Sequence, residues 1–149
     1  MTREEFIEIL DEKGYSYEIE GDKLVVTWGR LGIDLTYIYS IPADVEFRNL
    51  HHVRLSSLDT LPSGIEFNNT GRVTLESLIS LPHSVKFKNG GNINLESLTS
   101  IPPGVEFNNE GDVFLGSLSD GWFNEWNGNI EGIESNMLLN LMISKGLFI

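Results

Sequence analysis

The sequence predicts a mainly β protein, built as a single solenoid of 20-residue coils with two short strands per coil and a helical cap at each end. Two observations support this. Residues 41–120 divide into four blocks of twenty without insertion or deletion, sharing the pattern [IL]-P-x-x-[VI]-x-F-x-N-x-x-x-[VI]-x-L-x-S-L-x-x. Within each block, apolar and polar residues alternate twice. A short, fixed period is typical of stacked repeats, and alternation with period two is typical of half-buried strands.

Each block supplies two such alternations. Positions 5 and 7 are a β-branched residue and a phenylalanine, as in Val45 and Phe47; positions 13 and 15 are a β-branched residue and a leucine, as in Val53 and Leu55. These residues are expected to point inward from two strands. Apolar spacing then changes to three at the leucine of position 18, so the chain should turn there. The position-2 proline cannot donate to a β-ladder and marks another corner.

Polar residues at the corners are expected to satisfy the main chain. Asparagine recurs at position 9, in phase with the inward residues, and should form a ladder along the axis. Serine at position 17 should act in the same way at the next corner. The Gly90–Gly91 pair falls between the two strands of its block, where a positive φ is the expected reason for glycine. The recurring residues are Asn49, Asn69, Asn89 and Asn109, and Ser57, Ser77, Ser97 and Ser117.

The repeat predicts one domain with distinct ends. Thr2 and Glu5 have the spacing of a capping box, and Gly14 is placed to end the helix. Residues 21–40 fit the repeat loosely, with Val25 at position 5. After Asp120 the period fails, and a helix over 136–144 is expected to cover the last coil. The expected parts are an N-terminal helix and strand cap at 1–20, a degenerate coil at 21–40, four regular coils at 41–120 and a C-terminal cap with a helix at 121–149.

Composition narrows the functional classes. The chain has no cysteine, so thiolate chemistry and disulfides are excluded. Its net charge is −12, with the excess of acids at the two ends, so direct binding to nucleic acid is not expected. A partner protein with a basic surface suits this charge. With no basic leader and no long apolar run, the sequence predicts a cytoplasmic protein without a membrane span.

Catalytic and metal-binding patterns are weak. His51 and His52 are adjacent and His83 stands alone, which is not a metal-ligand spacing, and His52 is expected on the surface. Glu76 and Glu96 share position 16, so stacking would place their carboxylates about 4.8 Å apart, close to the spacing in a retaining glycosidase. Any ladder produces that spacing, however. We therefore expect a protein that is not an enzyme and uses no cofactor or metal, with a carbohydrate-active enzyme as a remote alternative.

Aromatic residues where the repeat ends suggest a protein-binding site. Phe114 takes an outward position that is polar in the other blocks, and further aromatics and acids follow it. Exposed aromatics beside charged groups are typical of binding hot spots. The alternative is that the tryptophans only plug the last coil. The candidate binding residues are Phe114, Trp122, Phe123, Trp126, Asp112, Asp120 and Glu125.

The pattern L-x-S-L-x-S-L-P-x-G-V-x-F-x-N resembles the short leucine-rich-like repeats of bacteriophage and bacterial proteins. Asn69 follows Phe67 by two positions rather than the three of the standard leucine-rich repeat, so a horseshoe and a β-solenoid both remain open. The resemblance implies a possible phage origin and no catalytic residues. We therefore expect a non-enzymatic, protein-binding solenoid, such as a phage-encoded acidic inhibitor of a host defence or nucleic-acid-handling protein, of the anti-CRISPR or DNA-mimic type. A structural or self-assembling homo-oligomer is the alternative.

Overall fold

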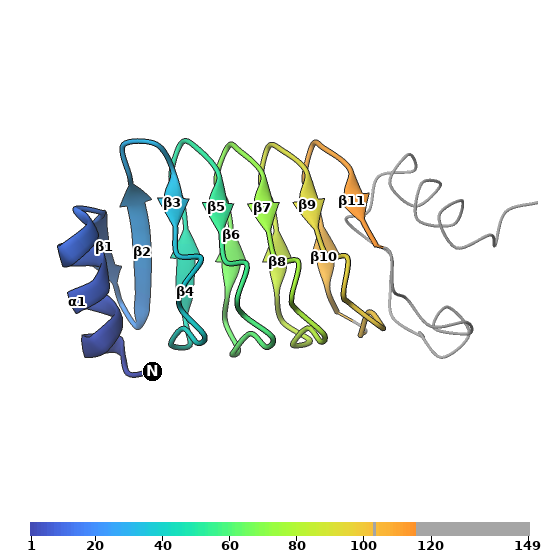
Figure 1. Cartoon of the computed structure of the whole chain (residues 1–149), viewed down its shortest axis with the longest axis horizontal. Helices are drawn as coiled ribbons and strands as arrows, with labels where there is room; N and C mark the ends of the chain where they lie inside the picture. Colours follow the sequence, from blue (N-terminus) through green and yellow to red (C-terminus); the bar gives the residue numbers. More distant parts are fainter. Residues whose placement is uncertain (103, 116–149) are drawn as a thin grey trace, which may run out of the picture.

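The computed structural model describes residues 1–102 and 104–115 and shows a stack of coils behind an N-terminal helix (Figure 1). The helix α1 (Arg3–Lys13) precedes the strands β1 (Ser16–Glu20) and β2 (Lys23–Trp28). The remaining strands are β3 (Ile33–Asp34), β4 (Val45–Phe47), β5 (Val53–Arg54), β6 (Glu66–Phe67), β7 (Val73–Thr74), β8 (Lys86–Phe87), β9 (Ile93–Asn94), β10 (Glu106–Phe107) and β11 (Val113–Phe114). The expected C-terminal helix over 136–144 lies outside the described residues.

The strands form two sheets on different sides of the coil. The first sheet has the order β1-β2-β4-β6-β8-β10, and the second has the order β3-β5-β7-β9-β11. Apart from the antiparallel β1–β2 hairpin, neighbouring strands are parallel, and equivalent residues pair, as Phe67 does with Phe47 and Phe87. The predicted mainly β solenoid with two strands per coil is confirmed, and the open choice between horseshoe and β-solenoid is settled as a β-solenoid.

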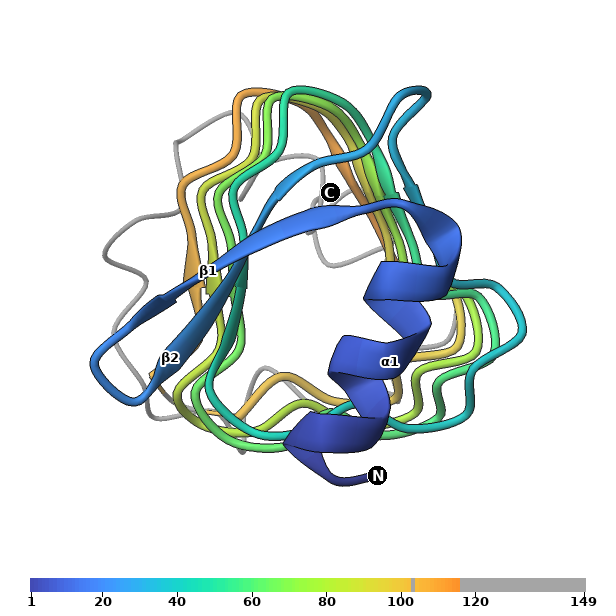
Figure 2. The same cartoon turned by 90° about the vertical axis from the view of Figure 1, so that its left-hand side faces the viewer.

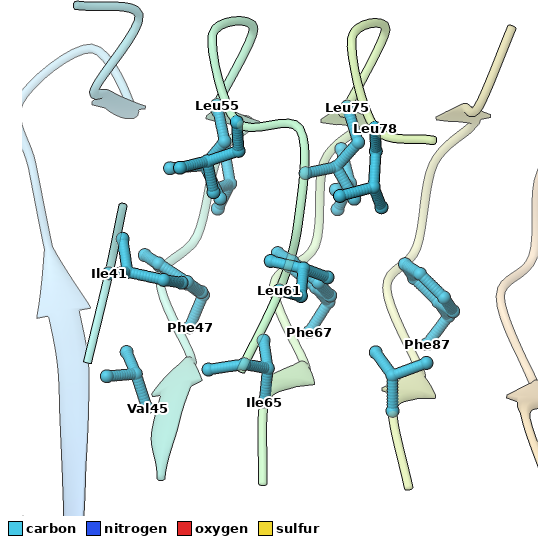
Figure 3. Packing of buried hydrophobic residues seen from close by; sticks show 14 of the residues in the cluster. Ile41, Val45, Phe47, Leu55, Leu61, Ile65, Phe67, Leu75, Leu78 and Phe87 are labelled. Atoms are coloured by element: carbon cyan, nitrogen blue, oxygen red, sulfur yellow. The ribbon is translucent and has the colours of Figure 1, made fainter. Parts of the chain in front are cut away.

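The core is built from equivalent residues of successive coils, which stack on one another along the axis (Figure 3). The rings of Phe47, Phe67, Phe87 and Phe107 stack with centroids 5.1–5.5 Å apart and interplanar angles of 3–7°. Within the described residues, the β-branched residues of position 5 and the leucines of positions 15 and 18 are buried around them. The inward rows that the sequence predicts for the regular coils are therefore correct. Each coil repeats the same alternation, and equivalent positions stack in register.

A ladder of asparagines lines one corner, as the sequence predicts. Asn69 donates from Nδ2 to the main-chain carbonyls of Gly71 and Arg72 in its own coil and of His51 in the preceding coil. The four asparagines of the ladder are buried. The carbonyls of Gly71 and Arg72 also accept main-chain amides, from Gly91 and Val53, so the asparagine is an additional donor that ties the turn to the preceding coil. At the next corner Ser57 donates to the carbonyl of Thr36, one coil earlier, whereas no equivalent bond is found for Ser77 or Ser97.

Glycine between the strands has a different cause from the one expected. Neither Gly90 nor Gly91 has a positive φ. A Cβ at Gly91 would instead lie 2.7 Å from the main-chain nitrogen of Arg72, and one at Gly90 would lie 2.5 Å from the carbonyl oxygen of Thr70. The prediction of a positive φ is wrong, because close approach between stacked coils, rather than turn geometry, excludes a side chain here.

The N-terminal end of the solenoid is covered by α1 and β1 (Figure 2). The capping box is present: Thr2 Oγ1 accepts from the amide of Glu5, and Glu5 Oε2 accepts from the amide of Thr2. Gly14 ends the helix in the left-handed conformation. Phe6 and Leu10 are fully buried against the first coil, so α1 closes the core. In the described part of the chain, no helix combines the length and the apolar character that crossing a membrane requires.

The coil nearest this cap departs from the expected register. Val45 pairs with Leu24 and Phe47 with Val26, so these residues, rather than Val25, face the core. The offset returns to twenty residues at β3, where Ile33 pairs with Val53. The turn between β2 and β3 therefore holds one more residue than later coils. The assignment of Val25 to the inward position 5 is wrong, because that extra residue shifts β2 by one and reverses its faces.

Candidate functional site

The outer face of the second sheet carries side chains that differ from coil to coil. In each strand of the second sheet (β3, β5, β7, β9 and β11) the second residue points outward, and the register aligns these residues along the axis. A second row lies two positions earlier, because side-chain direction repeats every two residues. The rows are Asp34, Arg54, Thr74, Asn94 and Phe114, and Gly32, His52, Arg72, Asn92 and Asp112.

Three hollows follow one another along this face. The first, of about 420 Å³, includes Trp28 and Arg54 in its lining. The middle one, of about 540 Å³, includes Arg54 and Arg72. The third, of about 320 Å³, includes Arg72 and Phe114. Since each arginine borders two neighbouring hollows, the three lie in a row along the solenoid, and we call this row the axial groove.

The axial groove is locally cationic on an acidic protein. Of the described residues, four of the nine lysines and arginines line it, against two of the 18 aspartates and glutamates. The cations are Lys13, Arg30, Arg54 and Arg72, and the anions are Asp34 and Glu76. Most of the charge of −12 therefore lies elsewhere on the chain, and this groove presents the opposite sign.

The carboxylate of Asp34 is already engaged. Its Oδ1 accepts from the hydroxyl of Thr36 at 2.5 Å and from the Thr36 amide at 3.1 Å, and its Oδ2 lies 3.4 Å from Arg54 Nη1. These bonds, with that of the Thr36 hydroxyl foremost, lower the pKa of Asp34 despite its partial burial. Within the described residues, no carboxylate lies within 4.0 Å of the guanidinium of Arg72. The guanidinium of Arg72, which lines the middle and third hollows, therefore has no ion-pair partner among the described residues.

The sequence predicts His52 on the surface, but in the structure its side chain is half-buried. Its ring packs on Gly32, which has a φ of 105°, and a Cβ there would lie 2.7 Å from the ring atom Cε1. Burial lowers the pKa of His52, and the charges of Arg54 and Arg72 lower it further. The imidazole is therefore neutral at pH 7, and it forms part of the wall of the first hollow.

Apolar side chains stand at both ends of the axial groove. Phe114, on β11, is 48% exposed, and Trp28, at the end of β2, is 47% exposed. Tyr37, which lines the middle hollow, is 85% exposed. Large exposed apolar side chains around a polar groove are typical of surfaces that bind other proteins.

Two of the sequence-predicted site residues lie on this face. Phe114 lines the third hollow, and Asp112 is exposed two residues earlier in the same strand direction. The structure therefore places them on the groove face. The other candidates, Trp122, Phe123, Trp126, Asp120 and Glu125, lie outside the described residues.

Sequence reasoning missed the cationic part of the groove. The outward row of Phe114, which includes Arg54, was recognised as polar in the other coils, but the proximity of Arg54 to Arg72 was not. The two arginines occupy different repeat positions, 14 and 12, in adjacent coils. A repeat aligned by equivalent positions reveals rows, whereas this pair lies on a diagonal. Examining neighbouring even positions of adjacent coils together would have found it.

The outer face of the first sheet holds an ion-pair network. Glu46 is only 2% exposed, and its carboxylate contacts both Lys23, at 3.1 Å, and Arg48. Lys23 also lies 3.1 Å from Glu66, and Arg48 binds both carboxylate oxygens of Glu20. Burial raises the pKa of Glu46, but hydrogen bonds from Arg48 and Lys23 outweigh it and lower the pKa from 4.5 to about 2. This network holds the β1–β2 hairpin to the first regular coil.

Lys86 lies between Glu66 and Glu106 in the outer row of the first sheet. Its Nζ lies 4.0 Å from Glu66, and within the described residues it has no ion pair with Glu106. Lys23, a residue of the cap, is the cation that bridges two carboxylates. The sequence could not show this, because Lys23 comes from the coil whose register is shifted.

Metal and carboxylate chemistry find little support in the geometry. Over residues 1–102 and 104–115, no group of three or more histidines, aspartates and glutamates is arranged to hold a metal ion. Glu76 and Glu96 are both exposed to solvent. Comparison with family models, with curated proteins and with solved structures finds no match to this chain.

Proposed function

We propose that this protein is a non-enzymatic, protein-binding solenoid that uses the outer face of its second sheet. The observation that carries the proposal is the exposed Phe114, placed in the axial groove on a row that is otherwise polar. An exposed aromatic costs solvation free energy in the free protein, and that cost is recovered when a partner covers the ring.

The rest of the coil supports this use. Residues common to the coils are occupied by the frame: the phenylalanines stack, the asparagines bond carbonyls and the leucines fill the core. A stack held by parallel main-chain pairing and by contacts between neighbouring coils presents its outer side chains at fixed spacing. Such preorganisation lowers the entropy cost of binding.

The proposal of a non-catalytic role rests on the solvent exposure of Glu76 and Glu96. A retaining glycosidase needs one carboxyl group with a raised pKa, which burial or an enclosed like charge provides. Glu76 and Glu96 are exposed, and water screens them. The separation of these two carboxylates follows from the stacking of coils alone.

A more specific form of the proposal is a small cytoplasmic inhibitor, encoded by a phage, that occupies a basic surface of a host defence or nucleic-acid-handling protein. The exposed acids of α1 support it, because they concentrate negative charge at the capped end of the solenoid. These are Glu4, Glu5, Glu8, Asp11 and Glu12. Such a complex should weaken steeply as salt is added; binding that is insensitive to salt would contradict this form but not the binding function itself.

The test of the binding function compares two exposed apolar residues on different parts of the coil. Phe114 is 48% exposed in the groove, and Ile79 is 52% exposed outside the groove lining. The full-length protein is used to capture binding proteins from host lysate, and the affinity of the purified partner is measured by calorimetry. Phe114→Ala should weaken binding at least about tenfold, while Ile79→Ala should leave it unchanged. Equal effects of the two changes would contradict the groove as the binding face.

Self-assembly remains the competing role for the same apolar groups. Light scattering at high protein concentration separates the two. A strict monomer supports binding to a different protein, whereas concentration-dependent oligomers abolished by Phe114→Ala would show that the face binds a second copy.

A further inference from the structure

We propose that the axial groove binds an extended, acidic peptide segment of the partner protein, with two carboxylates on Arg54 and Arg72. This proposal rests on the proposed binding function and adds the chemistry of the ligand. The net charge of −12 suggests a partner with a basic surface, whereas the segment proposed for the groove is acidic.

The dimensions of the groove suit a short extended segment. It runs across the strands from β3 to β11, a distance of four strand spacings, or about 19 Å. An extended chain covers about 3.3 Å per residue, so about six residues fill this length. The hollows follow one another along the axis, which favours a single strand-like segment over a globular protrusion.

The two arginines set the charge pattern of the segment. Arg54 lies on β5 and pairs with Thr74 of the adjacent strand β7, and Arg72 is two residues before Thr74, so the Cα atoms of the two arginines are about 8 Å apart. Residues i and i+2 of an extended peptide project on the same side about 7 Å apart. Arginine binds a carboxylate through two parallel N–H donors. Acids at i and i+2 therefore have a Cα spacing close to that of the two arginines.

The charge of the whole chain does not prevent this. Exposed charges beyond about 8 Å are largely screened at physiological ionic strength. Inside the groove, four cations face two carboxylates, and Asp34 is held by Thr36. The local sign is therefore positive where the peptide would lie.

Apolar groups at the groove ends define the rest of the segment. Phe114 borders the third hollow and Trp28 the first, so an apolar residue at either end of the acidic pair has a surface to cover. A nucleic acid strand fits less well, because evenly spaced phosphates need a run of cations. Here Thr74, Asn94 and the carboxylate of Glu76 interrupt the cationic lining.

The experiment is selection of a displayed library of random octapeptides on the full-length protein. Enriched peptides should carry two aspartates or glutamates at i and i+2 and an apolar residue near one end. The best peptide, labelled with fluorescein, is then titrated by fluorescence anisotropy. Arg54→Gln and Arg72→Gln should each weaken its binding at least about tenfold, as expected for loss of a charge-assisted hydrogen bond. Lys88→Gln, which removes an exposed cation outside the groove lining, should leave binding unchanged.

Each other outcome overturns the proposal. Enrichment of basic or uncharged peptides that depend on Phe114 would preserve the binding function while rejecting the acidic ligand. No enrichment, or equal loss with Lys88→Gln, would reject the groove site itself. A thymidine oligonucleotide that binds more tightly than the best peptide would assign the groove to nucleic acid. Thermal melts of the arginine variants confirm that the exposed substitutions leave the fold intact.

Discussion

The side-chain amide of Asn69 donates to the main-chain carbonyl of His51, one coil earlier, at 3.0 Å. The same amide nitrogen also reaches the carbonyls of Gly71 and Arg72 in its own coil. One buried group thereby closes a turn and joins two coils. The four Oδ1 atoms of the ladder accept no hydrogen bond within the described residues, so the donor side of each amide carries the interaction.

Replacing this amide should destabilise the protein measurably. Asn69→Ala removes a buried donor that three main-chain carbonyls share and should lower the free energy of unfolding by about 1–3 kcal/mol. Asn69→Asp should cost more, because a carboxylate would face carbonyl oxygens. Urea unfolding followed by circular dichroism measures both. Asn68→Ala, one residue earlier and exposed, is the matched control and should change stability by less than about 0.5 kcal/mol.

The phenylalanine column should be the largest single contributor to stability. Phe67 is fully buried, and its ring stacks on both Phe47 and Phe87. Phe67→Ser should cost about 3–5 kcal/mol or more, from lost burial, a cavity and an unpaired hydroxyl. Phe114→Ser, the same change at an exposed position, is the control in thermal unfolding. Equal melting temperatures for the two variants would contradict the inward assignment of Phe67.

Stability should depend on pH through Glu46. Its pKa is lowered from 4.5 to about 2 in the folded protein, so the unfolded chain binds more protons between these values. The stabilisation by its charge is therefore fully present above about pH 4.5 and is lost as the pH falls through about 2, by up to about 3 kcal/mol.

Glu46→Gln isolates this contribution. The variant should be less stable than the parent at pH 7, and the difference should shrink progressively toward pH 2 in urea titrations. Glu106→Gln is the same change at the equivalent position of the last described coil, where no cation lies within 4.0 Å among described residues. It should alter stability by less than about 0.5 kcal/mol at pH 7. A constant difference for Glu46→Gln across the pH range would exclude the ion-pair origin.

The two stacked glutamates of position 16 should respond differently to substitution. Glu76 lines the axial groove and Glu96 does not, so Glu76→Gln should strengthen binding of the acidic peptide by roughly two- to fivefold, as expected for removal of an exposed like charge. Glu96→Gln should have little effect. Fluorescence anisotropy at constant salt measures both. Loss of a glycosidase activity in the double variant would instead support the carbohydrate-active alternative.

The N-terminal cap shows how far sequence reasoning reaches. Thr2, Glu5 and Gly14 were assigned to the start and end of a helix, and the structure has those contacts. Helix caps are local, since their hydrogen bonds span three or four residues. The register of β2 was missed by one residue, because the extra residue in the following turn is visible only when β2 pairs with β4.

The proposed binding face was likewise predicted from the sequence only in part. Phe114 stood out as an apolar residue in a polar row, and the structure places it in the groove. Three features were not foreseen: Arg54 and Arg72 line the same hollow, Glu46 is buried beneath Lys23 and Arg48, and His52 packs on Gly32. Each joins residues at different repeat positions or from the irregular first coil.

The sequence by itself determined the length of the coil, the residues that face inward and the helical N-terminal cap. These features follow from periodicity and from hydrogen bonds between near neighbours, which an exact repeat displays directly. Only the tertiary structure decided where the charges meet, why Gly91 must be glycine and that a cationic groove crosses an acidic protein. These features depend on distances between stacked coils and on a one-residue shift in β2. They are therefore properties of the packing rather than of the repeat.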